Sequence, residues 1–288
     1  MAVCLFWKRV VLVLMPTVSF HSLICSEAPP LEERLELVSK CVKARDSFLK
    51  NYKAEISIAR FLDEAKWKEN RISMEEVLEL TKSGNQTKVE VNSKSPSGRQ
   101  IYEAVVWNGY IGKTWIRDLA HEDPGSGRVV IEPPQYISDK YAERYISTIS
   151  AKSWSDILEE SAVSNPIITF EKNRTKVSFE KGPDGDRSIW TIWFEDGRLF
   201  TPSQWRIESR AGLTAEPKLM AEYKVEEFTQ IEGVWLPKKL IRKSFDGKID
   251  VATISITLTA GSTEDFDIKW PSGASIWDSS TNQGYVVP

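Results

Sequence analysis

Alternation of apolar and polar residues with a period of two recurs along this chain and restricts its fold more than any other feature. In the segment 54–58, Ala54, Ile56 and Ile58 are separated by polar residues. Because successive side chains of a strand point to opposite faces, such a segment predicts a strand with one buried and one solvated face. Strands of this kind are typical of antiparallel sheets. The same pattern returns at 89–91, 177–179, 205–207, 219–225 and 252–258.

Turn-forming residue pairs stand between these segments. Asn108-Gly109 is a strong hairpin signal between predicted strands at 99–107 and 110–117. Asp184-Gly185 has the same role before a predicted strand at 187–194. Successive hairpins produce a meander, so we expect one large, curved antiparallel sheet.

Two segments have helical periodicity instead. Leu35, Val38 and Val42 form an apolar stripe on a predicted helix of about 18 residues that begins at Leu31. The section from Pro134 to about Ala162 also has helical spacing. A curved sheet has a concave face that must be covered, and these segments are its natural covers. The predicted fold is therefore a β-rich α+β domain: an unclosed half-barrel covered by an N-terminal helix and an inserted helical segment.

The first 25 residues have the organisation of a secretory signal peptide. Lys8 and Arg9 precede an apolar stretch that runs to Ile24 and is interrupted at Pro16. A membrane-spanning helix needs about 20 continuous apolar residues, which this stretch does not supply. We therefore expect export to the periplasm or cell envelope, removal of the signal, and no integral membrane domain.

Cysteine usage leaves two alternatives at the end of the signal. Ser22-Leu23-Ile24-Cys25 has the position of a bacterial lipobox, although bulky residues replace the usual small pair. Lipidation of Cys25 would tether the protein to a membrane, whereas cleavage beyond it would release the protein. The mature body keeps Cys41, alone or together with Cys25, and has no disulfide framework.

The chain divides into a signal peptide at 1–25, one domain at 26–264 and an extended tail at 265–288. The tail carries Phe266, Trp270 and other apolar residues that would be costly to expose, so we expect it to pack along the sheet. The net charge of −3 argues against a nucleic-acid partner, which needs a basic face. We expect a monomer.

Residues with catalytic or metal-binding chemistry are sparse in the predicted domain. His121 is its single histidine and stands beside two acids in a Pro/Gly turn. A zinc site needs three or four ligands at compatible spacing, and no Gly-x-Ser-x-Gly element is present. We therefore expect no catalysis, no metal site and no cofactor.

The segment 189–194 is apolar on both faces. Trp190, Ile192 and Phe194 point to one side of the predicted strand, and Ile189 and Trp193 to the other. Such a strand is either a central strand beneath the covering helices, or one of its faces lines a lumen for an apolar ligand. Stacking of sugar rings on the aromatic side chains is a third possibility. The candidate lumen residues are Trp107, Trp115, Trp190, Ile192, Trp193, Phe194 and Trp205.

The order of these elements, from about Leu31 to Ala260, resembles the lipoprotein-carrier fold of LolA and LolB and their relatives. The strand 223–228 followed by Gly233-Val234-Trp235-Leu236-Pro237 resembles a strand–turn–strand segment of exported LolA-like proteins. The tail also resembles those of such proteins, with Phe266, Trp270-Pro271-Ser272-Gly273, Asp278 and Tyr285.

This resemblance implies a hydrophobic lumen that shields acyl chains, and no catalysis. The expected function is that of an exported, non-catalytic binding protein for a lipid or a lipoprotein acyl chain. The alternative is an envelope protein-interaction or sensor domain that has a filled core and takes no small-molecule ligand.

Overall fold

The computed structural model describes residues 31–122, 124–131, 145–146, 148–149, 152–183, 187–212, 215–261 and 266–288. The predicted signal peptide, Cys25 and the turn at Asp184-Gly185 lie outside these residues. Residues 134–144 of the predicted helical insertion also lie outside them.

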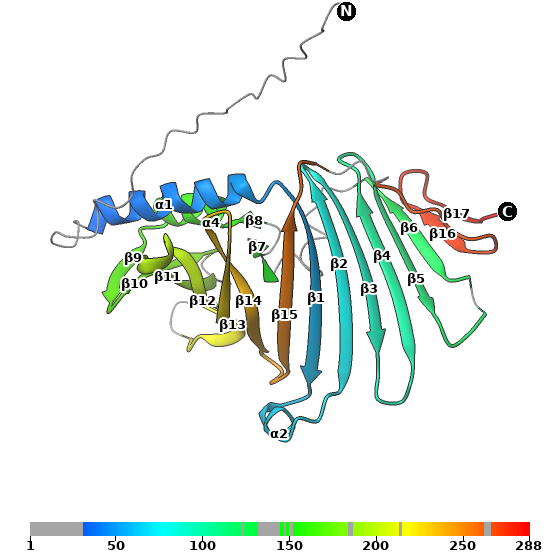
Figure 1. Cartoon of the computed structure of the whole chain (residues 1–288), viewed down its shortest axis with the longest axis horizontal. Coiled ribbons are helices and arrows are strands. Elements are labelled where there is room, and N and C mark those ends of the chain that lie inside the picture. Colours follow the sequence, from blue (N-terminus) through cyan, green and yellow to red (C-terminus); the bar gives the residue numbers. More distant parts are fainter. Residues whose placement is uncertain are drawn as a thin grey trace, which may run out of the picture.

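A single sheet of 15 strands organises the fold (Figure 1). Its order is β17-β16-β6-β5-β4-β3-β2-β1-β15-β14-β13-β12-β11-β10-β9. The strands before the insertion are β1 (Asn51–Phe61), β2 (Met74–Ser83), β3 (Gln86–Lys94), β4 (Gln100–Trp107), β5 (Gly112–Asp118) and β6 (Ser126–Val130). Those after it are β9 (Ile167–Glu171), β10 (Arg174–Lys181), β11 (Arg187–Glu195), β12 (Thr201–Arg210), β13 (Lys218–Ile231), β14 (Val234–Ser244), β15 (Ile249–Leu258), β16 (Ser275–Asp278) and β17 (Gln283–Val286).

Two antiparallel meanders meet in the middle of this sheet. One runs from β1 to β6 and the other from β9 to β15, and β1 pairs with β15 in the register Ile56↔Ile254. The terminal strands β17 and β9 do not pair with each other, so the sheet is curved but unclosed (Figure 1). The predicted half-barrel is confirmed.

One pairing differs from the expected antiparallel pattern. β16 runs parallel to β6, with Ser275 opposite Ser126, so the sheet is mixed. The local alternation of residues that predicted the other strands does not reveal this pairing, because the tail returns from β15 to a strand far from it in sequence.

The main core lies on the face of the sheet that carries Ile56, Ile192 and Leu240, which are fully buried. We call this the inner face and the opposite one the outer face. In β1 the burial alternates as the sequence predicts, with Tyr52, Ala54, Ile56 and Ile58 buried between exposed or half-buried residues. The hydrophobic effect on one side of each strand therefore fixes the register of the sheet.

Helices α1 (Leu31–Phe48) and α4 (Trp154–Val163) cover part of the inner face and lie against each other. The helix predicted from Leu31 is confirmed at its expected length of 18 residues, with Val38 and Val42 buried. α4 begins with a capping box, in which Ser153 accepts from the Asp156 N–H and Asp156 accepts from the Ser153 N–H. We call α1, residues 145–146 and α4 together the cover.

Short strands interrupt the section that was predicted to be helical. β7 (Thr148–Ile149) pairs with β8 (Lys152–Ser153) immediately before α4. A further short helix, α2 (Glu64–Lys68), connects β1 to β2 and is capped by Asp63, which accepts from the Lys66 N–H at 2.8 Å.

The tail packs on the outer face of the first meander. Phe266 and Ile268 are buried against Ala104 and Val106 of β4, in a cluster separate from the main core. At Gly127 of β6, an added Cβ would lie 2.7 Å from the Trp270 indole nitrogen. The absence of a side chain there lets the tail approach the sheet closely.

Candidate functional site

An aromatic patch occupies the inner face of β10 to β13. Phe179 of β10 stacks on Trp190 of β11, with ring centroids 6.1 Å apart. Trp205 of β12 stacks on Tyr223 of β13, with centroids 4.8 Å apart and planes within 14°. Neighbouring strands bring these rings together because Trp205 lies opposite both Ile192 and Tyr223 in the ladder. The patch is continuous with the apolar main core.

The cover closes this patch. Trp154 of α4 packs edge-on against Trp205, with centroids 5.0 Å apart and planes at 78°. Ile157 and Leu158, from the next turn of α4, are also buried in the main core. In the described structure, the inner face beneath α4 is therefore filled by side chains of the cover.

Two indole N–H groups in the patch lack acceptors. Nε1 of Trp190 and Nε1 of Trp205 are buried, and neither has a hydrogen-bond partner in the described part of the chain. The two residues lie on adjacent strands, at diagonal positions on the same face. A buried donor without an acceptor costs about 1–3 kcal/mol, so these groups mark a place where an added acceptor would be stabilised.

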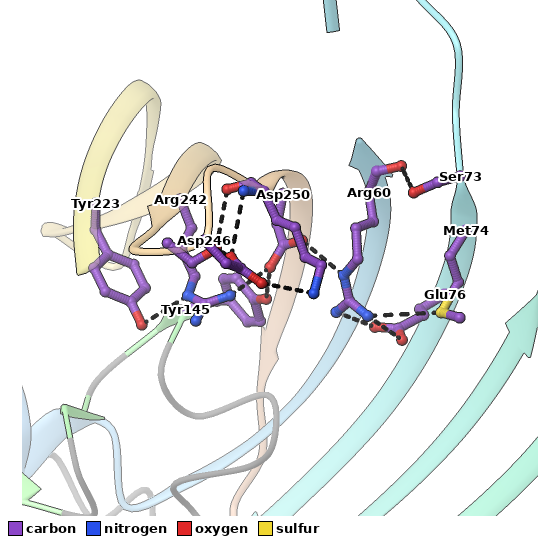
Figure 2. Close-up of polar contacts among 11 residues, drawn as sticks. Arg60, Ser73, Met74, Glu76, Tyr145, Tyr223, Arg242, Asp246 and Asp250 are labelled. Atoms are coloured by element: carbon purple, nitrogen blue, oxygen red, sulfur yellow. Dashed lines mark hydrogen bonds and ion pairs between the residues drawn. The ribbon is translucent and has the colours of Figure 1, made fainter. Parts of the chain in front are cut away.

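A charged cluster lies on the inner face where β1 ends and β15 begins (Figure 2). Asp250 is 1% exposed, and its carboxylate accepts from Arg60 Nε at 2.8 Å and from Arg242 Nη1 at 2.9 Å. The hydroxyl of Tyr145 donates to the same carboxylate at 3.4 Å. Asp250 therefore links the strands β1 and β14 to the cover.

Two further residues complete this cluster. Arg60 forms an ion pair with Glu76 of β2 at 3.2 Å, and Arg242 Nε donates to the Tyr223 hydroxyl at 3.2 Å (Figure 2). Burial by itself would raise the pKa of Asp250, but the Arg60 and Arg242 guanidiniums outweigh it and hold that pKa below its usual value. Burial by itself would lower the pKa of Arg242, but its contacts with Tyr223, Tyr145 and Asp250 raise it above its usual value. Asp250, Arg60 and Arg242 are therefore charged at neutral pH.

A second polar contact holds the two helices of the cover together. Asp46 of α1 accepts from the backbone N–H of Ser155 at 2.8 Å and from its hydroxyl at 2.9 Å, at the N-terminus of α4. Arg45 donates from Nη2 to the Ile146 carbonyl at 2.7 Å and lies 3.7 Å from Asp46. Burial raises the pKa of Asp46, and its contacts with Arg45 and Ser155 offset this only in part.

The predicted lumen residues separate onto two faces. Trp107, Trp190, Ile192, Phe194 and Trp205 all belong to the main core on the inner face. Trp115 instead joins the tail cluster on the outer face, where its indole N–H donates to the Pro124 carbonyl at 3.0 Å.

Trp193 also lies on the outer face. It is half-buried, and its indole N–H donates to Glu171 at 3.3 Å. The Lys176 ammonium lies 5.5 Å from the centre of its ring. The alternation of side chains within β11 accounts for this separation from Ile192 and Phe194.

Two hollows on the outer face flank the tail. One, of about 490 Å³, and another, of about 360 Å³, share Asp267 in their walls. Asp267 forms an ion pair with Lys113 between them. Their walls mix charged and aromatic side chains, unlike the aromatic patch on the inner face.

Other predicted features are found in ordinary surroundings. His121 is exposed in the turn after β5. Within the described ranges, no group of three or more His, Cys, Asp or Glu residues is placed to hold a metal ion. No helix in those ranges is long and apolar enough to cross a membrane.

Comparison with known proteins gives likenesses in structure only. No protein-family model matches the chain, and no curated protein matches it in sequence. A LolA superfamily protein from Nitrosomonas europaea is similar in structure at 13% identity, covering 84% of this chain and 99% of that one, with a TM-score of 0.47. A DUF1329 family protein from Desulfovibrio piger is similar at 12% identity, covering 89% of this chain and 100% of that one, with a TM-score of 0.41.

Proposed function

We propose that this chain is an exported, non-catalytic binding protein whose inner face takes the acyl chain of a lipid or lipoprotein. The observation that carries the proposal is the pair of indole N–H groups of Trp190 and Trp205, which have no acceptor among the described residues and lie in an otherwise apolar aromatic patch. An acyl chain combines the two properties that such a site selects, which are a long apolar surface and a carbonyl oxygen at one end.

Binding requires the cover to move, because Trp154, Ile157 and Leu158 fill the space above the patch. In this mechanism the acyl chain replaces the apolar side chains of α4, and the inner face stays dry throughout. The ester or carboxyl oxygen accepts from Trp190 or Trp205, which offsets the cost of burying those donors. The charged cluster around Asp250 stays at the end of the strands and holds the sheet in shape.

A second candidate function is an envelope interaction or sensor domain with a permanently filled core. The close packing of Trp154 against Trp205 favours it, because edge-to-face aromatic pairs stabilise a closed arrangement by about 0.5–1.5 kcal/mol beyond their burial. In that case the inner face takes no ligand and partners bind elsewhere.

Titration with a nitroxide-labelled fatty acid, followed by tryptophan fluorescence, distinguishes the two candidates. We expect saturable quenching by the labelled acid. Trp205→Phe keeps an aromatic ring, although a smaller one, and removes the indole N–H, so we expect the Kd to rise about fivefold, as the loss of one hydrogen bond predicts. Trp193→Phe on the outer face is the matched control and should leave the Kd unchanged.

Two results would contradict ligand binding at this site. One is the absence of saturable quenching, together with a ligand-free mass for the gently purified protein in native mass spectrometry. The other is an equal effect of Trp205→Phe and Trp193→Phe, which would place the label away from the inner face. The first result would favour the filled-core domain.

A further inference from the structure

The two ends of the sheet differ in how their outer strands are protected. At one end, β9 follows Pro166 and contains the charged residue Glu171. α1 lies against β9, and the Arg34 guanidinium sits 4.1 Å from the centre of the Phe170 ring. Proline, charge and a covering helix are the usual means by which proteins prevent an edge strand from pairing with another chain.

β17, at the other end, has none of these protections within the described structure. Its four residues, Gln283–Val286, are all exposed and include neither a charge nor a proline. Tyr285 is 45% exposed and Val286 is 63% exposed. An exposed, uncharged edge strand presents unpaired N–H and C=O groups that can pair with a further strand.

The hydrogen bonds at the end of β17 fix which of its backbone groups are open. Val287 donates its N–H to the Ala274 carbonyl at 2.9 Å, and its own carbonyl accepts from the Gly273 N–H at 2.8 Å. The N–H and C=O groups of successive residues point to alternate edges of an extended strand. Tyr285, two residues before Val287, therefore also directs its N–H and C=O toward β16. Gly284 and Val286 consequently direct theirs toward the open edge.

We propose that β17 pairs antiparallel with β17 of a second copy of this chain, about a two-fold axis through Tyr285. Because the axis passes through Tyr285, this residue lies opposite Tyr285 of the second copy, and both side chains are on the same face of the joined sheet. Gly284 then lies opposite Val286 of the second copy, and these two residues exchange the open N–H and C=O groups. No like charges meet in this register.

The side chains of β16 make this register self-complementary. Trp277 pairs with Gly284, and its ring lies 3.4 Å from the position that a Cβ of Gly284 would occupy. Trp277 is 44% exposed and lies on the inner face, as do Gly284 and Val286. Because Gly284 has no side chain, the ring of Trp277 is open to contact with Val286 of the second copy. The two-fold axis repeats this contact, which buries both indole rings.

β17 has only four residues, so the dimer buries less than the roughly 1,600 Å² of a standard interface and should be weak. Sedimentation of the full chain at increasing concentration tests it, up to about 0.5 mM, which is in the range of weak dissociation constants. We expect a reversible dimer. Val286→Pro removes an outward N–H and leaves the bonds of Tyr285 and Val287 to β16, so we expect it to remain a monomer.

Site-directed crosslinking tests the register independently. In a full chain with Cys4→Ser, Cys25→Ser and Cys41→Ser, we expect Tyr285→Cys to form a disulfide-linked dimer under mild oxidation. Gln283→Cys is the matched control, because the two Gln283 residues lie about 13 Å apart in this register, beyond the reach of a disulfide of about 7 Å. Three results would overturn the proposal. The first is a monomer at every concentration together with no disulfide-linked dimer of Tyr285→Cys. The second is a dimer that persists in Val286→Pro. The third is equal crosslinking of Tyr285→Cys and Gln283→Cys.

Discussion

Two carboxylates, the buried Asp250 and the half-buried Asp46, hold this molecule together in different ways. Asp250 in the sheet lies between the guanidiniums of Arg60 and Arg242, at 2.8 and 2.9 Å. Asp46 in the cover has one guanidinium nearby, at 3.7 Å, and otherwise accepts from Ser155 at the N-terminus of α4. Burial disfavours the charge of both carboxylates, but it is outweighed only in the sheet, so the pKa of Asp250 is lowered and that of Asp46 is raised.

This difference separates a fixed region from one that can open. Removing one partner of a buried ion pair leaves an uncompensated charge. Breaking the linkage that Asp250 makes between strands therefore costs much free energy. The contact of Asp46 with α4 is weaker, because separation of the helices lets water solvate a carboxylate that burial disfavours. Opening of the cover, which the proposed binding requires, would therefore break a weaker carboxylate contact than separation of the strands around Asp250.

Substitution of the sheet carboxylate should have the largest effect. Asp250→Asn leaves Arg60 and Arg242 without their shared counter-ion, and we expect a loss of about 3–5 kcal/mol in the free energy of unfolding, measured in urea. Asp246→Asn, in the exposed turn before β15, is the control and should cost far less. A loss for Asp250→Asn no larger than for the control would remove the distinction between the two regions.

Substitution of the cover carboxylate should have a smaller and more local effect. Asp46→Asn keeps an oxygen acceptor for Ser155 but weakens the bonds, so we expect a loss of about 1 kcal/mol. Cys41 of α1 is half-buried against the main core, so its thiol should react faster once the cover loosens.

The thiol measurement uses a chain with Cys4→Ser and Cys25→Ser, so that Cys41 alone is labelled. Glu36→Gln, on the exposed side of α1, is the matched control and should not change the labelling rate. If Asp46→Asn accelerates labelling no more than its loss of global stability requires, the cover does not open separately.

The smallest expected effect is on the pH dependence of stability, and its sign should differ between the two carboxylates. The pKa of Asp250 is lowered on folding, so its contribution is present above the ordinary carboxyl pKa and is lost as the pH falls through the folded value. The pKa of Asp46 is raised, so its contribution is largest below the ordinary value and is lost as the pH rises through the folded one.

Urea unfolding between about pH 3 and pH 7, which brackets ordinary carboxyl pKa values, measures both effects. On acidification, the stability difference between the unmodified chain and Asp250→Asn should shrink. The difference from Asp46→Asn should instead move in favour of the unmodified chain. Slopes of the same sign for the two variants would contradict the assignment.

Local patterns in the sequence predicted the strands and α1 because both depend on neighbouring residues. The alternation at Ala54, Ile56 and Ile58 corresponds to β1, and Asn108-Gly109 joins β4 to β5 as a hairpin. The apolar side of the segment 189–194 that carries Ile192 and Phe194 lies in the main core. These features require only the side-chain period and turn chemistry.

The charged cluster could not be predicted, because it depends on pairings between distant residues. Arg60 and Asp250 are separated by nearly the whole domain and meet only because β1 pairs with β15. In the sequence, nothing distinguishes either residue from an ordinary polar residue at the end of a strand. The alternation within the segment already placed Trp193 and Trp190 on opposite faces. The face of Trp115 could be assigned only from the register of β4 with β5.

The central position of the β1–β15 pair also governs how the chain can fold. Tyr52 pairs with Leu258, so β1, which is synthesised directly after α1, can pair only when β15 near the end of the domain is available. Each meander is built from local hairpins, but the seam between them closes only after nearly the whole chain is available. Folding rates fall as the sequence separation of contacts grows, so closure of this seam should be the slow step. A chain whose central strands pair so late stays incompletely folded until nearly all of the domain has been synthesised.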